Sequence, residues 1–238
     1  MTYSMICKIG TRKANEDSAA CIERGENRCF VVADGLGGHG SGDVAAGILV
    51  SVHEREFMAK NEKNGEFLAR VFALAQKEII AERRSAHDMK TTGVALSIID
   101  GSYAWCHIGD SRLYHFRRKR FRSHTLDHSV PQMLVHSGEI KDDDIRHHPD
   151  RNKLLRALGD EWDSPLYEVS KEKKLSKHDA FLLCTDGFWE HLPVEAITQA
   201  LKNSNNADEW LASLLATVET SAKDKNMDNY TAITVIAT

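Results

Sequence analysis

The feature that most constrains this chain is a short apolar run that leads into an aspartate followed by a glycine, and besides the hairpin signal at Asp100-Gly101 it occurs twice. The two copies are Cys29–Ala33 before Asp34-Gly35 and Phe181–Cys184 before Thr185-Asp186-Gly187. A short apolar run bounded by turn residues predicts a buried strand. Each aspartate is therefore expected at the edge of a sheet, next to a glycine that lets the backbone come close to a ligand.

The first copy continues into a glycine-rich turn, Gly35-Leu36-Gly37-Gly38-His39-Gly40-Ser41-Gly42, before a helical pattern begins. A carboxylate at a strand end beside an accessible backbone carbonyl suits a hard divalent cation such as Mg²⁺ or Mn²⁺. For this stretch taken alone, a glycine loop that only connects a strand to a helix is an equal alternative.

Further acids share the same setting, a predicted strand end beside glycine or asparagine. The set is Asp34, Asp110, Asp186 and Asp228, and Glu16-Asp17 opens another strand. Each aspartate alone is explained by turn or cap chemistry. Gathered together they repel one another, and cations must neutralise them. Two Mg²⁺ or Mn²⁺ ions roughly 4 Å apart can share a bridging aspartate and activate a water. Arg12 offers the planar fork that binds phosphate.

The spacing of apolar residues changes along the chain and predicts the order of elements. Short strands precede Asp34, and helices follow from about Ser41 and over about 66–84. An antiparallel meander occupies about 92–125, and a strand leads into Thr185. Helices over 194–202 and 208–222 and a last strand over 231–237 complete the chain. This order predicts an α+β fold in which two mainly antiparallel sheets pack between helix pairs, as one domain over 1–238.

Two segments stand apart from this pattern. The basic turn Arg117-Arg118-Lys119 separates two strands of the meander, and it is expected to be a solvated hairpin tip. A docking site for acidic phosphopeptides is the alternative, whereas nucleic-acid binding is disfavoured because no aromatic beyond Phe121 is interleaved with the basic residues. The polar, histidine-rich stretch 127–163 is expected to lie on the surface over a site, with His147-His148 as a solvated pair.

Composition and charge exclude several classes. The net charge of −4 gives no general attraction to nucleic acid or an acidic membrane. Five scattered cysteines without a Cys-x-x-Cys pair indicate reduced thiols. The N-terminus lacks the layout of a signal peptide, and no apolar run approaches a membrane span. A cytoplasmic protein is therefore expected.

Taken in order, these motifs resemble the PPM family, the metal-dependent type-2C serine/threonine protein phosphatases, in their compact bacterial form. The resemblance covers nearly the whole chain. It rests on Arg12-x-x-Asn15-Glu16-Asp17, Val32-Ala33-Asp34-Gly35-Leu36-Gly37-Gly38-His39, Thr91-Thr92-Gly93, Gly109-Asp110-Ser111-Arg112, Leu126-Asp127-His128-Ser129, Asn152-x-Leu154-x-Arg156-Ala157-Leu158-Gly159, Cys184-Thr185-Asp186-Gly187 and Asp228-Asn229. Eight motifs in the family's order make coincidence improbable.

The resemblance implies a four-layer α/β/β/α sandwich with two Mn²⁺ or Mg²⁺ ions. It implies that Asp34 bridges the ions and that the carbonyl of Gly35 binds one of them. Asp186 and Asp228 would complete the first ion, and Glu16 would hold the second through water.

Three further roles follow from the same resemblance. Asp17 would support the metal ligands, and Arg12 would bind the substrate phosphate. Asp110, with Asp186, would hold a possible third ion. The implied reaction is direct attack by a metal-activated water on phosphoserine or phosphothreonine, without a phosphoenzyme.

One position departs from the family pattern. Some members carry a histidine directly after the Asp-Gly pair, and this histidine is proposed as the general acid. Here that position is Leu36, and His39 lies three residues further on. The acid is therefore unassigned, with metal-bound water as a candidate. The family's flap subdomain corresponds to about 129–163, and its composition does not specify a substrate.

The leading hypothesis is a protein phosphatase that opposes a bacterial Ser/Thr kinase, as a monomeric catalytic domain with phosphoprotein partners. A catalytically weak phosphoprotein-binding module is one alternative, disfavoured because every expected metal ligand is present. A small-molecule phosphoesterase is another, and comparing turnover on phosphopeptides with turnover on nucleotides or sugar phosphates distinguishes it. The physiological substrate, the kinase and the native metal are open at this stage.

Overall fold

The computed structural model describes residues 1–37, 41–59, 63–83, 89–223 and 226–238. Within them the strands form two sheets. The first sheet has the order β1-β12-β11-β7-β8, and each neighbouring pair is antiparallel. Its strands are β1 (Thr2–Lys8), β7 (Arg112–Arg117), β8 (Arg120–His124), β11 (Asp179–Cys184) and β12 (Tyr230–Ile236).

The second sheet has the main order β10-β6-β5-β3-β2, again with antiparallel neighbours, while β4 pairs with β3 and β9 with β6. Its strands are β2 (Asp17–Arg24), β3 (Asn27–Leu36), β4 (Lys90–Thr91), β5 (Gly93–Ile99), β6 (Ser102–Ile108), β9 (Glu168–Val169) and β10 (Lys173–Lys174). Short turns join β2 to β3 and β5 to β6, whereas the chain between β3 and β5 forms helices and β4.

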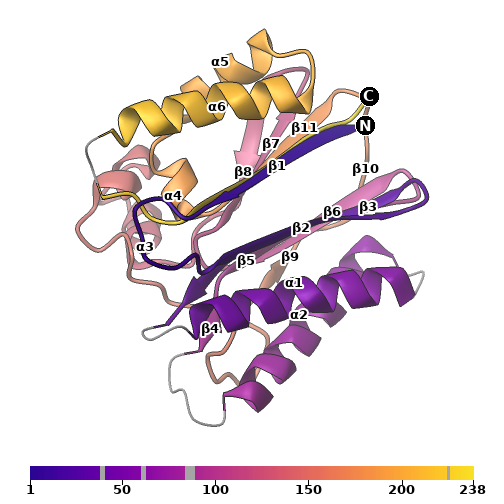
Figure 1. Ribbon diagram of the computed structural model, residues 1–238, viewed down its shortest axis with the longest axis vertical. Helices are drawn as coiled ribbons and strands as arrows, with labels where there is room; N and C mark the ends of the chain where they lie inside the picture. Colours follow the sequence, from indigo (N-terminus) through magenta and orange to yellow (C-terminus); the bar gives the residue numbers. More distant parts are fainter. Residues whose placement is uncertain (38–40, 60–62, 84–88, 224–225) are drawn as a thin grey trace.

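Helices cover the outer faces of both sheets. Figure 1 shows one pair of helices beneath the second sheet and another pair above the first. The lower pair is α1 (Gly42–Ala59) and α2 (Asn64–Glu82), and the upper pair is α5 (Val194–Asn203) and α6 (Ala207–Ser221). The predicted four-layer α/β/β/α sandwich is therefore confirmed. No helix of the described residues is both long enough and apolar enough to cross a bilayer.

Three hydrophobic clusters fill the three interfaces between the layers. Phe30, Phe181 and Ile233 belong to the cluster between the sheets. Phe72 on α2 packs in the cluster under the second sheet, and Trp210 on α6 packs in the cluster over the first. Each of these side chains is fully buried. Burying a large apolar side chain of this kind contributes about 1.5–3 kcal/mol. Successive side chains of a strand point to opposite faces of the sheet, so apolar residues on both faces stabilise the sandwich.

The segment between β8 and β9 contains α3 (Val130–Ser137) and the 3₁₀ helix η1 (Asp142–His147). Ser129 caps α3, because its side chain accepts a hydrogen bond from the backbone N–H of Gln132. Gly138 ends the helix in a left-handed conformation, with φ of 79°. Short bridges from Ser129 to Leu154 and from Leu158 to Thr91 join this segment to itself and to the second sheet.

The sequence-based element boundaries differ from the structure in specific places. Asp186 does not end β11; it is the first residue of a one-turn helix, α4 (Asp186–Trp189). β9 is only two residues long, because Leu166 and Tyr167 before it pack against the cluster under the second sheet instead of extending the strand. The short strands β4 and β10 were not predicted, since two residues carry no periodicity.

Candidate active site

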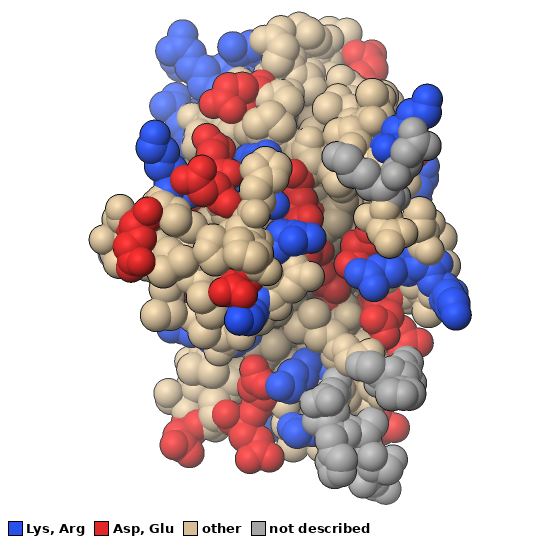
Figure 2. Space-filling view, turned by 90° about the vertical axis from the view of Figure 1, so that its left-hand side faces the viewer, with Lys and Arg blue, Asp and Glu red and all other residues tan. Residues whose placement is uncertain are grey.

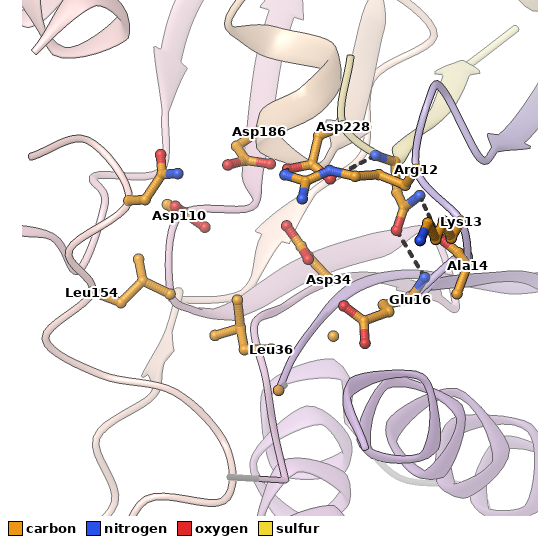
Figure 3. A pocket seen from close by; sticks show the side chains of 14 residues that line it. Arg12, Lys13, Ala14, Glu16, Asp34, Leu36, Asp110, Leu154, Asp186 and Asp228 are labelled. Atoms are coloured by element: carbon orange, nitrogen blue, oxygen red, sulfur yellow. Dashed lines mark hydrogen bonds and ion pairs between the residues drawn. The ribbon is translucent and has the colours of Figure 1, made fainter. Parts of the chain in front are cut away.

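The acids that the sequence singled out meet at one end of the sandwich. The face in Figure 2 shows acidic side chains set back near its centre, with basic side chains beside them. The acidic side chains line a pocket of about 440 Å³ together with Arg12. Figure 3 shows their carboxylates directed toward a common space. The acidic lining residues are Glu16, Asp34, Asp110, Asp186 and Asp228, and Gly35 lines the pocket beside them.

Asp34 is positioned by the hydrogen bonds of its backbone. Its N–H donates to Thr92 Oγ1 at 3.1 Å, and its carbonyl accepts from the N–H of Thr92 and from Thr91 Oγ1, both at 2.9 Å. Thr92 Oγ1 also contacts Ser111 Oγ at 2.7 Å. The motif around Thr91 and Thr92 therefore fixes the strand end that carries the central carboxylate.

Gly35 is required by the close approach of two backbones. Its N–H donates to the carbonyl of Glu16 at 3.1 Å. A Cβ at Gly35 would lie 2.2 Å from the carbonyl oxygen of Gly42, and a Cβ at Gly42 would lie 2.6 Å from the carbonyl carbon of Gly35. Only glycine at both positions lets the start of α1 pack against the end of β3.

Asn229 organises the side of the pocket that carries Arg12. Its side-chain oxygen accepts from the N–H of Glu16 at 2.8 Å, and its Nδ2 donates to the carbonyls of Ile9 and Ala14 at 2.8 and 2.9 Å. Its own N–H donates to Asp228 Oδ1 at 2.8 Å. In the sequence Asn229 is distinguished only as the neighbour of Asp228. Its donor and acceptor groups are the only indication in the sequence that it could organise a turn.

Arg12 lies at the rim of the pocket. Its Nη2 pairs with Asp228 Oδ2 at 2.5 Å, and its side chain is 58% exposed. Lys13 lines the pocket next to it and was not predicted. The guanidinium can therefore reach the acids from solvent, where an incoming phosphate would arrive.

Asp17 and Asp110 are held by residues around α4. Asp17 does not line the pocket; one of its carboxylate oxygens accepts from Thr185 Oγ1 at 3.0 Å. Its other oxygen, Oδ1, is buried without a hydrogen-bond partner among the described residues. Asp110 is 5% exposed, and its carbonyl accepts from Trp189 Nε1 at 2.9 Å.

The electrostatics of the cluster are unfavourable without cations. Burial, and then the neighbouring carboxylates, raise the pKa values of Asp34 and Asp110 well above their ordinary range and raise that of Asp186. The same two causes raise the pKa of Asp17 to about 7. Burial and the charges of nearby acids also raise the pKa of Glu16. An all-oxygen donor set with this excess of negative charge fits Mg²⁺ or Mn²⁺.

The general acid is not identified by the pocket lining. Leu36 lines the pocket and has no proton to donate. His39, together with Gly38 and Gly40 of the glycine-rich turn, lies outside the described residues.

Asn152 and Leu154 approach the pocket from the segment after η1. That segment therefore forms one wall of the pocket.

A second cluster, formed by His107, His128 and Glu168, lies next to the turn before Asp110, and His107 Nδ1 is buried in it without a hydrogen-bond partner among the described residues. The ligating atoms of His107, His128 and Glu168 lie within 4.8 Å of one another. His128 Nδ1 accepts from the N–H of Gly109 at 3.1 Å, so Nε2 carries the ring proton and faces Glu168 at 3.3 Å. A protonated Nε2 has no lone pair for a metal. The cluster thus supports the turn before Asp110.

Comparison with known proteins places this chain in a family. The model of the family "Protein phosphatase 2C" matches residues 8–230. The serine/threonine phosphatase stp of Listeria monocytogenes is 33% identical over 207 residues, which cover 83% of this chain and 81% of the relative. The chain therefore belongs to the protein phosphatase 2C family, and it is a serine/threonine protein phosphatase of the PPM type.

Solved structures agree. The Mycobacterium tuberculosis serine/threonine phosphatase PstP/Ppp is 28% identical, with a TM-score of 0.82 and coverage of 98% of this chain and 96% of the other. The catalytic domain of PstP in complex with two manganese ions is 26% identical, with a TM-score of 0.81 and coverage of 98% and 96%. The family resemblance drawn from the motifs is confirmed.

Proposed function

We propose that this phosphatase hydrolyses phosphoserine and phosphothreonine in proteins at a centre of two Mn²⁺ or Mg²⁺ ions held by the buried acids. Asp34 would be the ligand shared by the ions, the carbonyl of Gly35 and the carboxylates of Asp186 and Asp228 would hold one, and Glu16 would hold the other through water. When bound, the ions neutralise the acids and activate a water for attack on phosphorus.

The observation that carries this proposal is the charge of the pocket. Five carboxylates line it, and the pKa values of four are raised by burial and by nearby carboxylates. A protein keeps such a cluster only where cations neutralise it. Asp17 would support the metal ligands through its hydrogen bond with Thr185, and Asp110 with Asp186 would hold a third, optional ion.

Arg12 binds the substrate phosphate. It pairs with Asp228 in the absence of ions, and a cation on Asp228 would release its guanidinium for a bidentate contact to a phosphoryl group. Lys13 lies beside it and adds positive charge at the same rim. Arg12 therefore orients the phosphoryl group over the metal ligands.

A peptide fits the surroundings of the pocket better than a small molecule does. A second hollow of about 670 Å³ shares Arg12, Lys13 and Asp228 with the first and extends to Arg151 and His191. This continuous cleft accommodates residues on either side of a phosphorylated serine or threonine. The flap, about 129–163, contributes Asn152 to both hollows and belongs to the same single domain, 1–238.

We place the enzyme in the cytoplasm as a monomer that opposes a bacterial Ser/Thr kinase. The cysteines are all free, and three of them are buried, which suits a reducing compartment. The net charge of −4 gives no reason to expect nucleic-acid binding or membrane insertion.

The test measures phosphate release from a phosphothreonine peptide with Mn²⁺ and with chelator. Activity that requires Mn²⁺ and disappears with chelator supports the proposal. Peptide binding without turnover would instead indicate a binding module. Faster turnover of nucleotides or sugar phosphates than of phosphopeptides would indicate a small-molecule phosphoesterase. A pull-down with Asp34→Asn as a substrate trap identifies the physiological substrate.

A further inference from the structure

A basic surface lies at the end of the sandwich that is remote from the acidic pocket. β7 starts two residues after Asp110 and runs away from the pocket to the turn at Arg118-Lys119. This turn and the segment that includes β10 form the surface. We define the basic patch as Arg118, Arg120, Lys173 and Lys177, all of which are exposed.

Contacts between the two segments hold the basic patch together. The N–H of Arg118 donates to the carbonyl of His178 at 2.9 Å, next to Lys177. Lys173, on β10 of the second sheet, is close enough to β7 for its charge to affect His115. The pKa of His115 is lowered mainly by burial and further by the charges of Arg117 and Lys173. The patch therefore spans the edges of both sheets.

The local charge is strongly positive although the chain is acidic overall. Residues 117–122 contain five Lys or Arg and residues 171–178 contain four, against Glu172 as the single acid in both segments. The side chain of Glu172 is held by Asn64 Nδ2 at 3.3 Å. Asp179, which follows the second segment, is fully buried and bound by Arg117 and His115. Glu172 is therefore the only exposed negative charge within these two segments, and they keep a large excess of positive charge.

The backbone of the Arg118-Lys119 turn is strained, although basic side chains could be presented without such strain. Arg118 and Lys119 have φ of 53° and 55°, in the left-handed region. Glycine or asparagine is preferred in a two-residue hairpin turn of this kind. Lys119 has a structural use, because its Nζ donates to the carbonyls of Lys202 and Ser204 at 3.1 and 2.8 Å. The side chain of Arg118 is exposed, and such strain is often kept at functional positions.

We propose that the basic patch docks an acidic segment of the phosphoprotein substrate, separate from the phosphorylated residue. This inference rests on the proposed function and adds a second contact that selects substrates. Exposed large apolar side chains, which anchor proteins to membranes, occur in neither segment among the described residues. Phe121 packs against the core, so the patch also lacks a free aromatic ring for stacking on bases. An acidic polypeptide matches a surface that offers charge alone.

The fold sets the length of chain between the two contacts. β7 has six residues, and at about 3.3 Å per residue it separates the turn from the pocket by about 20 Å. A flexible linker of about 15 residues has a root-mean-square span of about 21 Å. An acidic segment placed that far from the phosphorylated residue can therefore reach the patch while the phosphate is in the pocket.

The test compares two phosphothreonine peptides. One is short, and the other continues through a glycine-serine linker of about 15 residues into a run of glutamates. We expect kcat/KM to be about tenfold higher for the second, mainly through a lower KM, because linking raises the effective concentration of the phosphate. The advantage falls at high salt. In Arg118→Gly/Arg120→Ser it drops below about twofold, with unchanged turnover of the short peptide.

Arg118→Gly also removes the backbone strain, so Tm is expected to hold or rise, which separates lost docking from unfolding. The matched control is Lys77→Ser/Lys223→Ser, which removes two exposed cations elsewhere. An equal loss in the control, or an advantage that survives in the patch variant, would overturn the proposal. Binding of duplex DNA or anionic vesicles, but not of the glutamate peptide, would show that the partner is wrong. No turnover of the short peptide would count against the proposed function instead.

Discussion

Two buried carboxylates, Asp110 and Asp127, lie on either side of Arg112, and their charges are satisfied in opposite ways. Asp127 is 1% exposed at its side chain and accepts two hydrogen bonds of 2.7 Å from the Arg112 guanidinium. That guanidinium also stacks 3.6 Å over the ring of Trp189. Asp110 instead faces other acids, and its pKa is raised by burial and by Asp186.

The difference shows where the fold supplies its own counter-charge and where it requires one from outside. A buried, bidentate ion pair offers no site to a ligand, because the charges and hydrogen-bonding atoms of both partners are already paired. A buried set of like charges leaves a site that only cations complete. Trp189 contacts both regions, since its Nε1 donates to the carbonyl of Asp110. We call the surroundings of the Arg112–Asp127 pair the closed region and the surroundings of the clustered acids the open region. The closed region can thus hold the open region in place.

Asp34→Asn should give the largest effect and test the open region. We expect turnover to fall by at least about 1,000-fold, equivalent to about 4 kcal/mol in the barrier, because the shared metal ligand is lost. The metal-free variant should be at least as stable as the parent, because one buried like charge is gone. Phosphate release and chelator-treated Tm measure the two effects. Near-normal activity would exclude the bridging role.

Arg112→Met should test the closed region. It leaves Asp127 buried without its partner, which we expect to cost about 3–5 kcal/mol of unfolding free energy. Urea unfolding of the metal-free protein measures this. Arg112→Met/Asp127→Leu removes both charges and should recover most of the loss. If the single variant is as stable as the parent, the contrast between the two regions fails.

Arg12→Ala should affect substrate rather than metal. The loss of a charged contact to phosphate predicts a KM about 10- to 100-fold higher, or about 1.4–2.7 kcal/mol. Mn²⁺ affinity, measured by calorimetry, should be unchanged or slightly stronger, because Asp228 loses a competing partner. Lower Mn²⁺ affinity with an unchanged KM would contradict the phosphate role.

The smallest expected effect is a pH dependence of metal stabilisation. The pKa of Asp17 is raised to about 7 from an ordinary value near 3.8. Between these values the metal-free folded protein binds more protons than the unfolded chain, so this group makes folding more favourable as the pH falls. Metal binding requires the deprotonated acids. The Tm gain on adding Mn²⁺ should therefore shrink by a few degrees between about pH 8 and pH 6.

Buried histidines act in the other direction. Burial lowers the pKa of His53 to about 4, so its contribution to stability is lost as the pH falls below its unfolded value of about 6.5. Taking the difference between samples with and without Mn²⁺ removes this term, because His53 is distant in sequence from the acids and packs against Phe67 and Phe72. A Tm gain that is constant with pH would argue against proton competition at the acids.

The family, the layer order and the identity of the clustered acids could all be predicted from the sequence. Motifs such as Asp34-Gly35 keep their order along the chain, and the strand and helix periods reflect which faces are buried. These are local properties, so they can be recognised without coordinates. The sequence placed Asp186 at the end of a strand, whereas in the structure it is the first residue of α4. A four-residue helix has too little periodicity to be distinguished from a strand end in the sequence.

Which side chains meet depends on the packing of the folded chain and could not be predicted from the sequence. The hydrogen bonds of Asn229 to the Arg12 loop, the pairing of Arg112 with Asp127, and the contact of Arg118 with the backbone of His178 all join positions far apart in sequence. Neighbouring residues of the same type, such as Asp110 and Asp127, therefore take opposite electrostatic roles. Pattern shows which residues are placed at sheet edges, whereas only packing shows which charges find a partner there.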